Sequence, residues 1–212
     1  RSGHKEHEES FIGLELGVKR IKDIINSTRT SLSFEEHKVE MVLATCGTEL
    51  VVRDILFLTK HLLEKKNIHL VISKPDHQVY FECELNSIVN QVFSNIFTNA
   101  IKFTNKNGII KFDIYEDCRT NEIVFKVTDN GIGIPTEMIA ILYDYDKKAS
   151  RAGTDGEVGT GYGLPLVKSY IENYNGNLIV TSQSIEEFPD DHWTCFTIRL
   201  KKLEESVQKI AL

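Results

Sequence analysis

Apolar residues recur at helical spacing near the start of the chain. Phe11, Leu14, Val18, Ile21 and Ile25 follow one another at steps of three, four, three and four. This is the a/d spacing of a helix that packs against partner helices, and one helix alone cannot bury the resulting stripe. The pattern therefore predicts a separate N-terminal helix, followed by a polar connection.

Beyond residue 38, the spacing of apolar positions changes repeatedly between that of strands and that of helices. Strands are expected over Val39–Thr45, Ile68–Ser73, Val79–Cys83, Ile109–Tyr115, Glu122–Thr128, Asn177–Gln183 and Trp193–Leu200. Helices are expected over Glu49–Asn67, Leu85–Thr104 and Gly161–Tyr174, with at most a short helix at residues 136–143. Thr48 is placed to cap the first of these helices. The apolar side of that helix would carry Leu50, Val51, Ile55, Leu58, Leu62 and Leu63.

The order of these elements predicts an α+β fold. Asn107 and Gly108 open a hairpin between the two strands that follow them, which favours antiparallel pairing. We expect a two-layer α/β sandwich, in which a mixed, mostly antiparallel sheet carries three helices on one face. The N-terminal helix would stand apart from this sandwich.

Composition narrows the class of protein. The chain has 212 residues, of which 41% are hydrophobic and 26% charged, as in ordinary globular proteins. A net charge of −6 argues against a general nucleic-acid binder. No apolar run approaches the roughly 18 to 20 residues of a membrane span. The cysteines form no C-x-x-C pair and no metal cage is visible, so we expect reduced thiols and a cytoplasmic location.

The second expected helix carries a row of polar side chains. Asn95 and Asn99 are four residues apart and therefore lie on one face, which Lys102 shares. Amide oxygens are hard ligands that suit Mg²⁺, and an ammonium group offsets phosphate charge. Taken alone, the two asparagines are better explained as an ordinary polar helix face.

Two glycine-containing turns follow. Asp129, at a strand end, begins the sequence Asp-Asn-Gly-Ile-Gly-Ile-Pro, in which the carboxylate could accept a hydrogen bond from an exocyclic amine such as that of adenine. A tight turn with a capping Asp is the alternative. Residues 156–167 place several glycines at the opening of a helix, where free backbone N–H groups form an anion site. The polar stretch before them predicts a mobile lid, although a flexible loop before a helix is the simpler interpretation.

Together these motifs are more specific than each is alone. Asn99, Asp129 and Gly159 recur at intervals of 30 residues, each at a junction between helix and strand. Their order and spacing resemble the N box and the two glycine boxes of the GHKL ATPase superfamily. Within it, Val39–Leu200 is similar to the catalytic, ATP-binding domain of a sensor histidine kinase.

The resemblance implies roles for individual residues. Asp129 would bind the adenine amine, with Gly131 and Gly133 in the turn beside it. Asn99 would hold Mg²⁺, while Asn95 and Lys102 would contact the phosphates. The nucleotide pocket would include Phe103 and Ile134. The second glycine box would cradle the phosphates with Gly159, Thr160, Gly161, Tyr162, Gly163 and Leu164.

One position bears on the reaction. The superfamily members that hydrolyse ATP carry a Glu where this chain has Asn95, and an amide cannot act as a base at neutral pH. The resemblance therefore implies transfer of the γ-phosphoryl group to another nucleophile, with catalysis by positioning and charge neutralisation. In the family this acceptor is a histidine on a dimeric helical hairpin, and the phosphoryl group then passes to a response-regulator receiver domain.

The chain departs from the family pattern in two places. No acceptor motif is present, because His7 shares only its acidic neighbour with it. We therefore expect residues 1–37 to be the end of the hairpin, 38–200 the catalytic domain and 201–212 a tail. The lid region carries Tyr143 and Tyr145 where a phenylalanine-rich stretch is usual, and Pro165 lies early in the last helix.

Partners and alternatives follow from the same resemblance. We expect a homodimer in the full-length protein, which could be the cytoplasmic part of a membrane-bound sensor, and no nucleic-acid partner. A nucleotide-binding module that regulates a partner without phosphotransfer is one alternative. A serine kinase of the anti-sigma type is another, although such proteins are usually the bare domain without the N-terminal helix.

Overall fold

The computed structural model describes residues 42–144, 151–157, 161 and 163–204. The expected N-terminal helix, the boundary at residue 37 and the end of the tail lie outside these ranges. Within them, no helix is both long and apolar enough to cross a bilayer.

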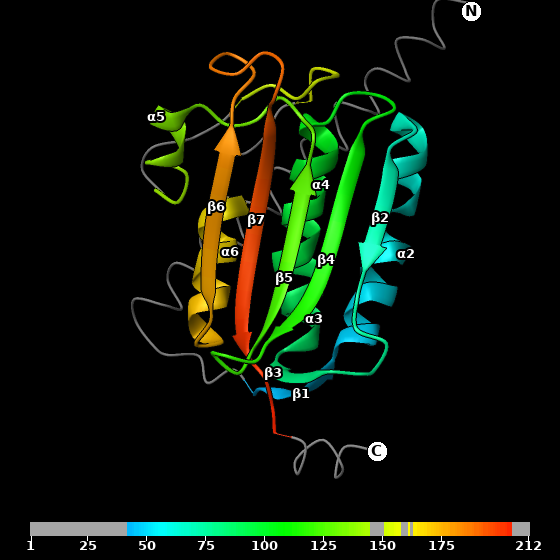
Figure 1. Ribbon diagram of the computed structural model, residues 1–212, viewed down its shortest axis with the longest axis vertical. Coiled ribbons are helices and arrows are strands. Elements are labelled where there is room, and N and C mark those ends of the chain that lie inside the picture. The colour runs from blue at the N-terminus through cyan, green and yellow to red at the C-terminus, as the bar shows by residue number, and fades with distance from the viewer. Residues whose placement is uncertain (1–41, 145–150, 158–160, 162, 205–212) are drawn as a thin grey trace, which may run out of the picture.

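The main sheet has five strands in the order β2-β4-β5-β7-β6 (Figure 1). The strands are β2 (His69–Ser73), β4 (Ile109–Asp117), β5 (Glu122–Asp129), β6 (Asn177–Gln183) and β7 (Trp193–Lys201). Only β2 and β4 pair in parallel, and the other three pairs are antiparallel. The expected mixed, mostly antiparallel sheet is confirmed, including the hairpin of β4 and β5.

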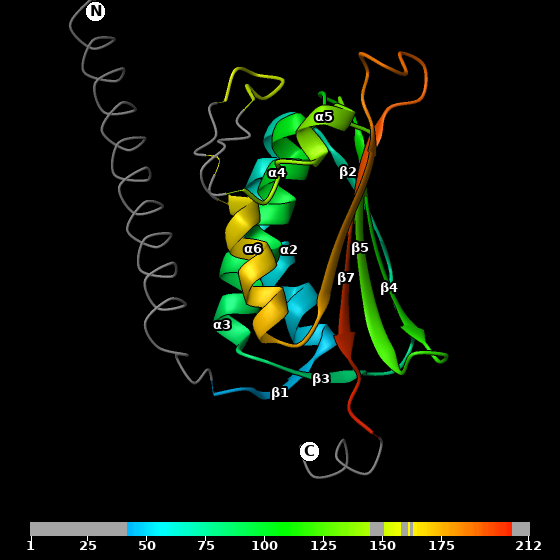
Figure 2. The same cartoon turned by 90° about the vertical axis from the view of Figure 1, so that its left-hand side faces the viewer.

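Helices cover one face of this sheet, and the side view shows the opposite face without a helix in the described part (Figure 2). The first is α2 (Thr48–Lys66), and the last is α6 (Gly163–Asn173). Between them runs a helix in three parts, α3 (Leu85–Ser87), η1 (Ile88–Phe93) and α4 (Ser94–Phe103). The short α5 (Thr136–Ile139) lies near the end of β6. The predicted α+β sandwich is confirmed.

Two short strands form a second sheet. The strand expected at Val39–Thr45 begins outside the described residues, and within them β1 (Ala44–Gly47) pairs antiparallel with β3 (Tyr80–Cys83). β3 therefore does not pair with β2, although only the turn at Pro75 separates them. A bridge from Phe81 to Lys202 connects this small sheet to the chain after β7.

The prediction for the start of α2 was wrong in one detail. Gly47 occupies the cap position, and Thr48 is the first helical residue. The Thr48 hydroxyl is buried against the turn before β3, where it accepts a hydrogen bond from the Val79 backbone N–H at 3.5 Å. It anchors the turn rather than capping the helix.

The buried side of α2 is also rotated from the predicted stripe. Leu58 and Leu62 are 41% and 37% exposed, and Leu50 is 36% exposed. The side that faces the core carries Val51, Val52, Ile55, Thr59, Leu63 and Lys66. Polar residues in this set hid the true stripe from a pattern based on apolar positions.

A cluster of phenylalanines determines how the central helix lies on the sheet. Phe97 meets Phe112 of β4 edge-to-face with ring centroids 5.2 Å apart, and Phe93 meets Phe125 of β5 at 5.2 Å. All four rings are buried, and such pairs add to the stabilisation from burial itself. Because residues two positions apart point to nearly opposite sides of a helix, Asn95, which lies between Phe93 and Phe97, is turned away from the sheet.

The central helix is not uniform. We expected one continuous helix, but residues 88–93 form a π-helical stretch, in which the Ser94 backbone N–H donates to Val89 five residues earlier. Such stretches are rare and frequently lie next to functional sites. Here the stretch ends at Phe93, two residues before Asn95.

Candidate functional site

The polar row of α4 consists of Asn95, Asn99 and Lys102, all half-buried. The Asn95 amide nitrogen donates to the Gln91 carbonyl at 2.5 Å, which leaves its oxygen available. A Cβ on Gly163 would lie 2.8 Å from that oxygen, so the first turn of α6 packs directly against Asn95. The Asn99 side chain has no hydrogen-bond partner within the described part of the chain. Among the described residues, neither amide oxygen accepts a hydrogen bond, so both keep acceptor capacity on this face of α4.

Asp129 is a buried carboxyl at the end of β5, 3% exposed. One of its oxygens accepts a hydrogen bond from the Gly131 backbone N–H at 3.0 Å. Burial raises the pKa of this carboxyl to about 7, against the opposing effect of its backbone hydrogen bonds. The side chain keeps further acceptor capacity for a donor that enters from outside.

The sequence analysis missed Thr194, which faces Asp129 across the β5–β7 pair and is also buried. The Ser182 hydroxyl accepts from the Ile134 backbone N–H at 2.8 Å and donates to the Trp193 carbonyl at 2.6 Å. Because its hydrogen is then used, the Thr194 hydroxyl is the donor in their 3.0 Å contact. The first glycine turn is thereby connected to β6 and β7. Only the strand register reveals this threonine, since its sequence neighbours carry no motif.

The two glycines of the first turn lie so close to neighbouring backbone atoms that a side chain at either position would clash with them. A Cβ on Gly131 would lie 2.4 Å from the Phe103 carbonyl oxygen. Gly133 has φ +67°, and a Cβ there would lie 1.8 Å from the Gln183 carbonyl oxygen. These contacts press the turn against the end of α4 and against β6. Ile134, which follows, is half-buried and packs on the core.

A segment that precedes the second glycine box (Gly159–Leu164), residues 151–157, contacts both sides of this region. The Arg151 guanidinium donates to the Gly133 carbonyl at 3.1 Å and pairs with Glu186 at 2.8 Å. The Lys102 ammonium donates to the Arg151 carbonyl at 3.0 Å and lies 4.6 Å from the centre of the Phe103 ring. Burial lowers the pKa of Lys102, and the nearby carboxylate of Glu157 opposes this effect. Lys102 therefore binds segment 151–157 in this structure.

The second glycine motif is described only in part. Gly159, Thr160 and Tyr162 lie outside the described residues. Gly161 has φ +80°, and Gly163 begins α6. Leu164 is half-buried and packs on the core, and Pro165 lies in the first turn, where the missing N–H is tolerated.

The elements that carry the described site residues approach one another toward one end of the sandwich. The end of β5, the end of α4 and the start of α6 all lie at the upper end of the molecule in Figures 1 and 2. Within the described ranges, no group of three or more His, Cys, Asp or Glu side chains could hold a metal ion.

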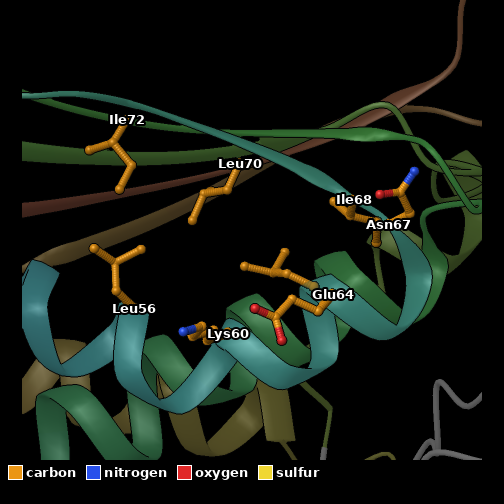
Figure 3. A pocket seen from close by; sticks show the side chains of 8 residues that line it. Leu56, Lys60, Glu64, Asn67, Ile68, Leu70 and Ile72 are labelled. Carbon is orange, nitrogen blue, oxygen red and sulfur yellow. The ribbon is translucent and has the colours of Figure 1, made fainter.

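A separate groove of about 360 Å³ lies between α2 and the edge strand β2. Figure 3 shows Leu56 of α2 facing Leu70 and Ile72 of β2 across it. Lys60 and Glu64 line its outer side. It includes none of the predicted nucleotide residues and is distinct from the candidate site.

Comparison with known sequences covers the same region. The model of the family described as histidine kinase-, DNA gyrase B-, and HSP90-like ATPase matches residues 84–204, more than half of the chain. A sensor protein kinase WalK of Staphylococcus saprophyticus is 29% identical over 125 residues, which are 59% of this chain and 20% of the relative. A WalK sequence of Staphylococcus aureus is 27% identical over 125 residues, 59% of this chain and 30% of its own length. The chain thus spans 20 to 30% of the length of these relatives.

Solved structures share the fold. Acinetobacter baumannii histidine kinase AdeS superposes with a TM-score of 0.68 at 20% identity, over 92% of this chain and 84% of that one. Histidine kinase ThkA, in complex with the response regulator protein TrrA, gives 0.63 at 18% identity over 88% and 49%. The family match includes α4, Asp129 and the start of α6, which the structure brings to one end. The chain belongs to the family of histidine kinase-, DNA gyrase B- and HSP90-like ATPases.

Proposed function

We propose that this chain is the ATP-binding catalytic domain of a sensor histidine kinase, which transfers the γ-phosphoryl group of ATP to a histidine. The observation that carries the proposal is the meeting of three features at one end of the sandwich. These are the buried carboxyl of Asp129, the free amide oxygens of Asn95 and Asn99, and the glycine-lined start of α6.

Asp129 would recognise the base. Its buried carboxyl has acceptor capacity beyond the hydrogen bond from Gly131, and the exocyclic amine of adenine is a donor of suitable chemistry. The Thr194 hydroxyl faces it from the neighbouring strand and gives the pocket a second polar group. A carboxylate with a pKa of about 7 would ionise more completely once an amine donor enters.

Asn99 would hold Mg²⁺ together with phosphate oxygens, since an amide oxygen is a hard ligand and this one has no hydrogen-bond partner among the described residues. The cation, when bound, neutralises phosphate charge. Asn95 would position the phosphates against the first turn of α6, whose backbone N–H groups attract anions. Lys102 would exchange its contact with the Arg151 carbonyl for a phosphate oxygen.

The residues of α4 favour transfer over hydrolysis. Ser94–Phe103 contains no acidic or imidazole side chain, so this helix supplies no base to activate water. The phosphoryl group would instead pass to a nucleophile that a second domain brings to the site. Such a reaction depends on positioning and charge neutralisation.

The acceptor histidine and the partners belong to the same proposal. We place the acceptor on a helical hairpin to which residues 1–37 would belong, with residues 38–200 as the catalytic unit. A homodimer and transfer to a response regulator would follow, and the complex of ThkA with TrrA supports that partner class.

The first test is calorimetric titration with a non-hydrolysable ATP analogue, with and without Mg²⁺. We expect binding that tightens with Mg²⁺, and Asn99→Ala should abolish the Mg²⁺ dependence because it removes the ligand oxygen. Asn90→Ala is the matched control, since Asn90 is an exposed asparagine one turn before the row.

Three results would contradict parts of the proposal. Failure of the wild-type protein to bind the analogue would refute the nucleotide site. An unchanged Mg²⁺ response in Asn99→Ala would refute the cation ligand alone. Binding without transfer of label from γ-labelled ATP, when a histidine-bearing hairpin is supplied, would favour a regulatory nucleotide-binding module.

A further inference from the structure

The end of α2 places a buried ammonium group under the candidate site. Lys66 is the last residue of this helix, and its side chain is only 5% exposed. Its Nζ donates to the backbone carbonyls of Ile101 and Lys102 at 3.1 Å and approaches that of Thr104 at 3.5 Å. These carbonyls lie at the C-terminal end of α4, where unpaired acceptors and the helix dipole attract a cation.

The same ammonium binds segment 151–157 from the other side. Its Nζ donates to the Thr154 hydroxyl at 2.8 Å and pairs with the Glu157 carboxylate at 2.9 Å. Asp155 lies farther away, at 4.0 Å. One buried charge thus joins two parts of the chain that are some fifty residues apart in sequence, the end of the helix that carries Asn99 and the segment that leads to the second glycine motif.

Segment 151–157 is itself a closed turn. The Gly153 N–H donates to the Glu157 carbonyl at 2.8 Å, and the Gly156 N–H donates to the Gly153 carbonyl at 2.9 Å. The Thr154 N–H donates to the Lys102 carbonyl at 3.0 Å. The turn therefore behaves as one unit, and holding Thr154 and Glu157 fixes its position on α4.

The electrostatics agree with this geometry. Burial would raise the pKa of Glu157, but the hydrogen bond from Lys66 and backbone donors outweigh it and hold the pKa below its usual range. A buried ammonium that lost this partner would be an uncompensated charge, which is strongly unfavourable. Each group therefore holds the other in place.

We propose that Lys66 is a positioning residue for the phosphate end of the site, although α2 contributes no residue to the predicted nucleotide pocket. It holds segment 151–157 on the end of α4 and so sets where the chain enters the second glycine motif, two residues after Glu157. The inference rests on the proposed nucleotide function. Its specific claim is that Lys66 affects phosphate binding and leaves adenine binding intact.

The test compares Lys66→Met, which keeps the side-chain length and removes the charge, with Lys65→Met. Lys65 is the exposed lysine beside it in the same helical turn. Affinity for a non-hydrolysable ATP analogue with Mg²⁺ is measured by calorimetry, and affinity for adenosine by NMR titration. We expect Lys66→Met to weaken analogue binding by about tenfold or more, the effect of losing a charged hydrogen bond, with adenosine binding unchanged. Lys65→Met should match the wild type in both.

Hydrogen exchange of residues 151–157 in the nucleotide-free protein tests the anchor itself. We expect Lys66→Met to speed this exchange at least about tenfold, while Lys65→Met does not. Equal weakening of analogue and adenosine, or no change in exchange, would overturn the proposal. If Lys66→Met does not fold, Glu157→Gln and Thr154→Val must produce the same selective loss. If the wild-type protein binds no analogue, but Lys66→Met still speeds hydrogen exchange of residues 151–157 relative to it, the proposed function is refuted. The role of Lys66 in holding this segment is then still supported.

Discussion

Asp129 is both buried and, among the described residues, without a cationic partner, which is unfavourable for a carboxylate. It is 3% exposed, and within the described residues its charge is balanced by a backbone hydrogen bond from Gly131 and by no cation. Burial of an unpaired carboxylate is costly, so the group keeps its proton up to a pH of about 7. Under the proposed function, the amine of a bound adenine would supply the donor that this carboxyl lacks.

The unfavourable burial of Asp129 predicts a pH dependence of stability. An Asp in the unfolded chain ionises near pH 3.9, whereas Asp129 ionises near pH 7. Between these values the folded protein holds a proton that the unfolded chain has lost, so stability falls as pH rises from about 4 to 7. In the Asp129→Asn variant this dependence is absent, because an amide does not ionise in this pH range. The free energy of unfolding of the wild type should therefore decline relative to the variant by up to about 4 kcal/mol and level off above pH 7.

Urea unfolding at a series of pH values from 4 to 8.5 measures this difference. Asp76→Asn, at an exposed aspartate in the turn before β3, is the control and should show no such decline. A difference between wild type and Asp129→Asn that stays constant over the whole range would mean that Asp129 ionises normally.

At the residue scale, the sequence predicts the motif residues but not their supports. Asn95, Asn99 and Asp129 could be identified because helical spacing and strand ends are visible in one dimension. Thr194 and Lys66 could not, because their importance comes from the β5–β7 register and from the contact of α2 with α4. A lysine at a helix end is ordinarily solvated, and only the fold buries this one.

At the scale of elements, local signals predicted most strands and helices correctly. The strand at Asn177–Gln183 and the hairpin of β4 and β5 have the expected bounds within a few residues. The π-helical stretch and the partner of β3 were not predictable, because both depend on packing with distant residues. The local sequence pattern does not indicate whether β3 pairs with β1 or with β2.

The turn after β5 is predicted to tolerate no side chain at Gly133. Gly133→Ala adds a Cβ 1.8 Å from the Gln183 carbonyl oxygen in a backbone of positive φ, so both strain and a clash arise. Gly156→Ala, at φ +79° with nothing within 4 Å, has the strain alone and is the matched control. We expect a loss of about 1 kcal/mol for Gly156→Ala and at least twice that for Gly133→Ala, by urea unfolding. Equal losses would mean that β6 shifts to accommodate the added methyl group without a further loss of stability.

At the scale of the whole molecule, the described core is continuous. Its buried apolar residues run from Cys46 to Leu200 and include both sheets and all three covering helices. A piece containing residues 38–204 should therefore fold alone and unfold in one cooperative transition, with a urea m-value expected for its size. Separate transitions by fluorescence and circular dichroism would contradict a single unit that begins at residue 38.

The small sheet of β1 and β3 has a mechanical consequence. It lies at the lower end in Figure 1, opposite the end that carries Asp129. β1 is joined to β3, which the bridge from Phe81 to Lys202 and the hydrogen bond from Leu203 to Tyr80 fasten to the chain after β7. A pulling force applied between Ala44 and Lys202 would load the β1–β3 pairing and the contacts of β3 with residues 202 and 203 first. The load path bypasses α4 and the start of α6, so tension between these two points would leave the opposite end of the domain unstrained.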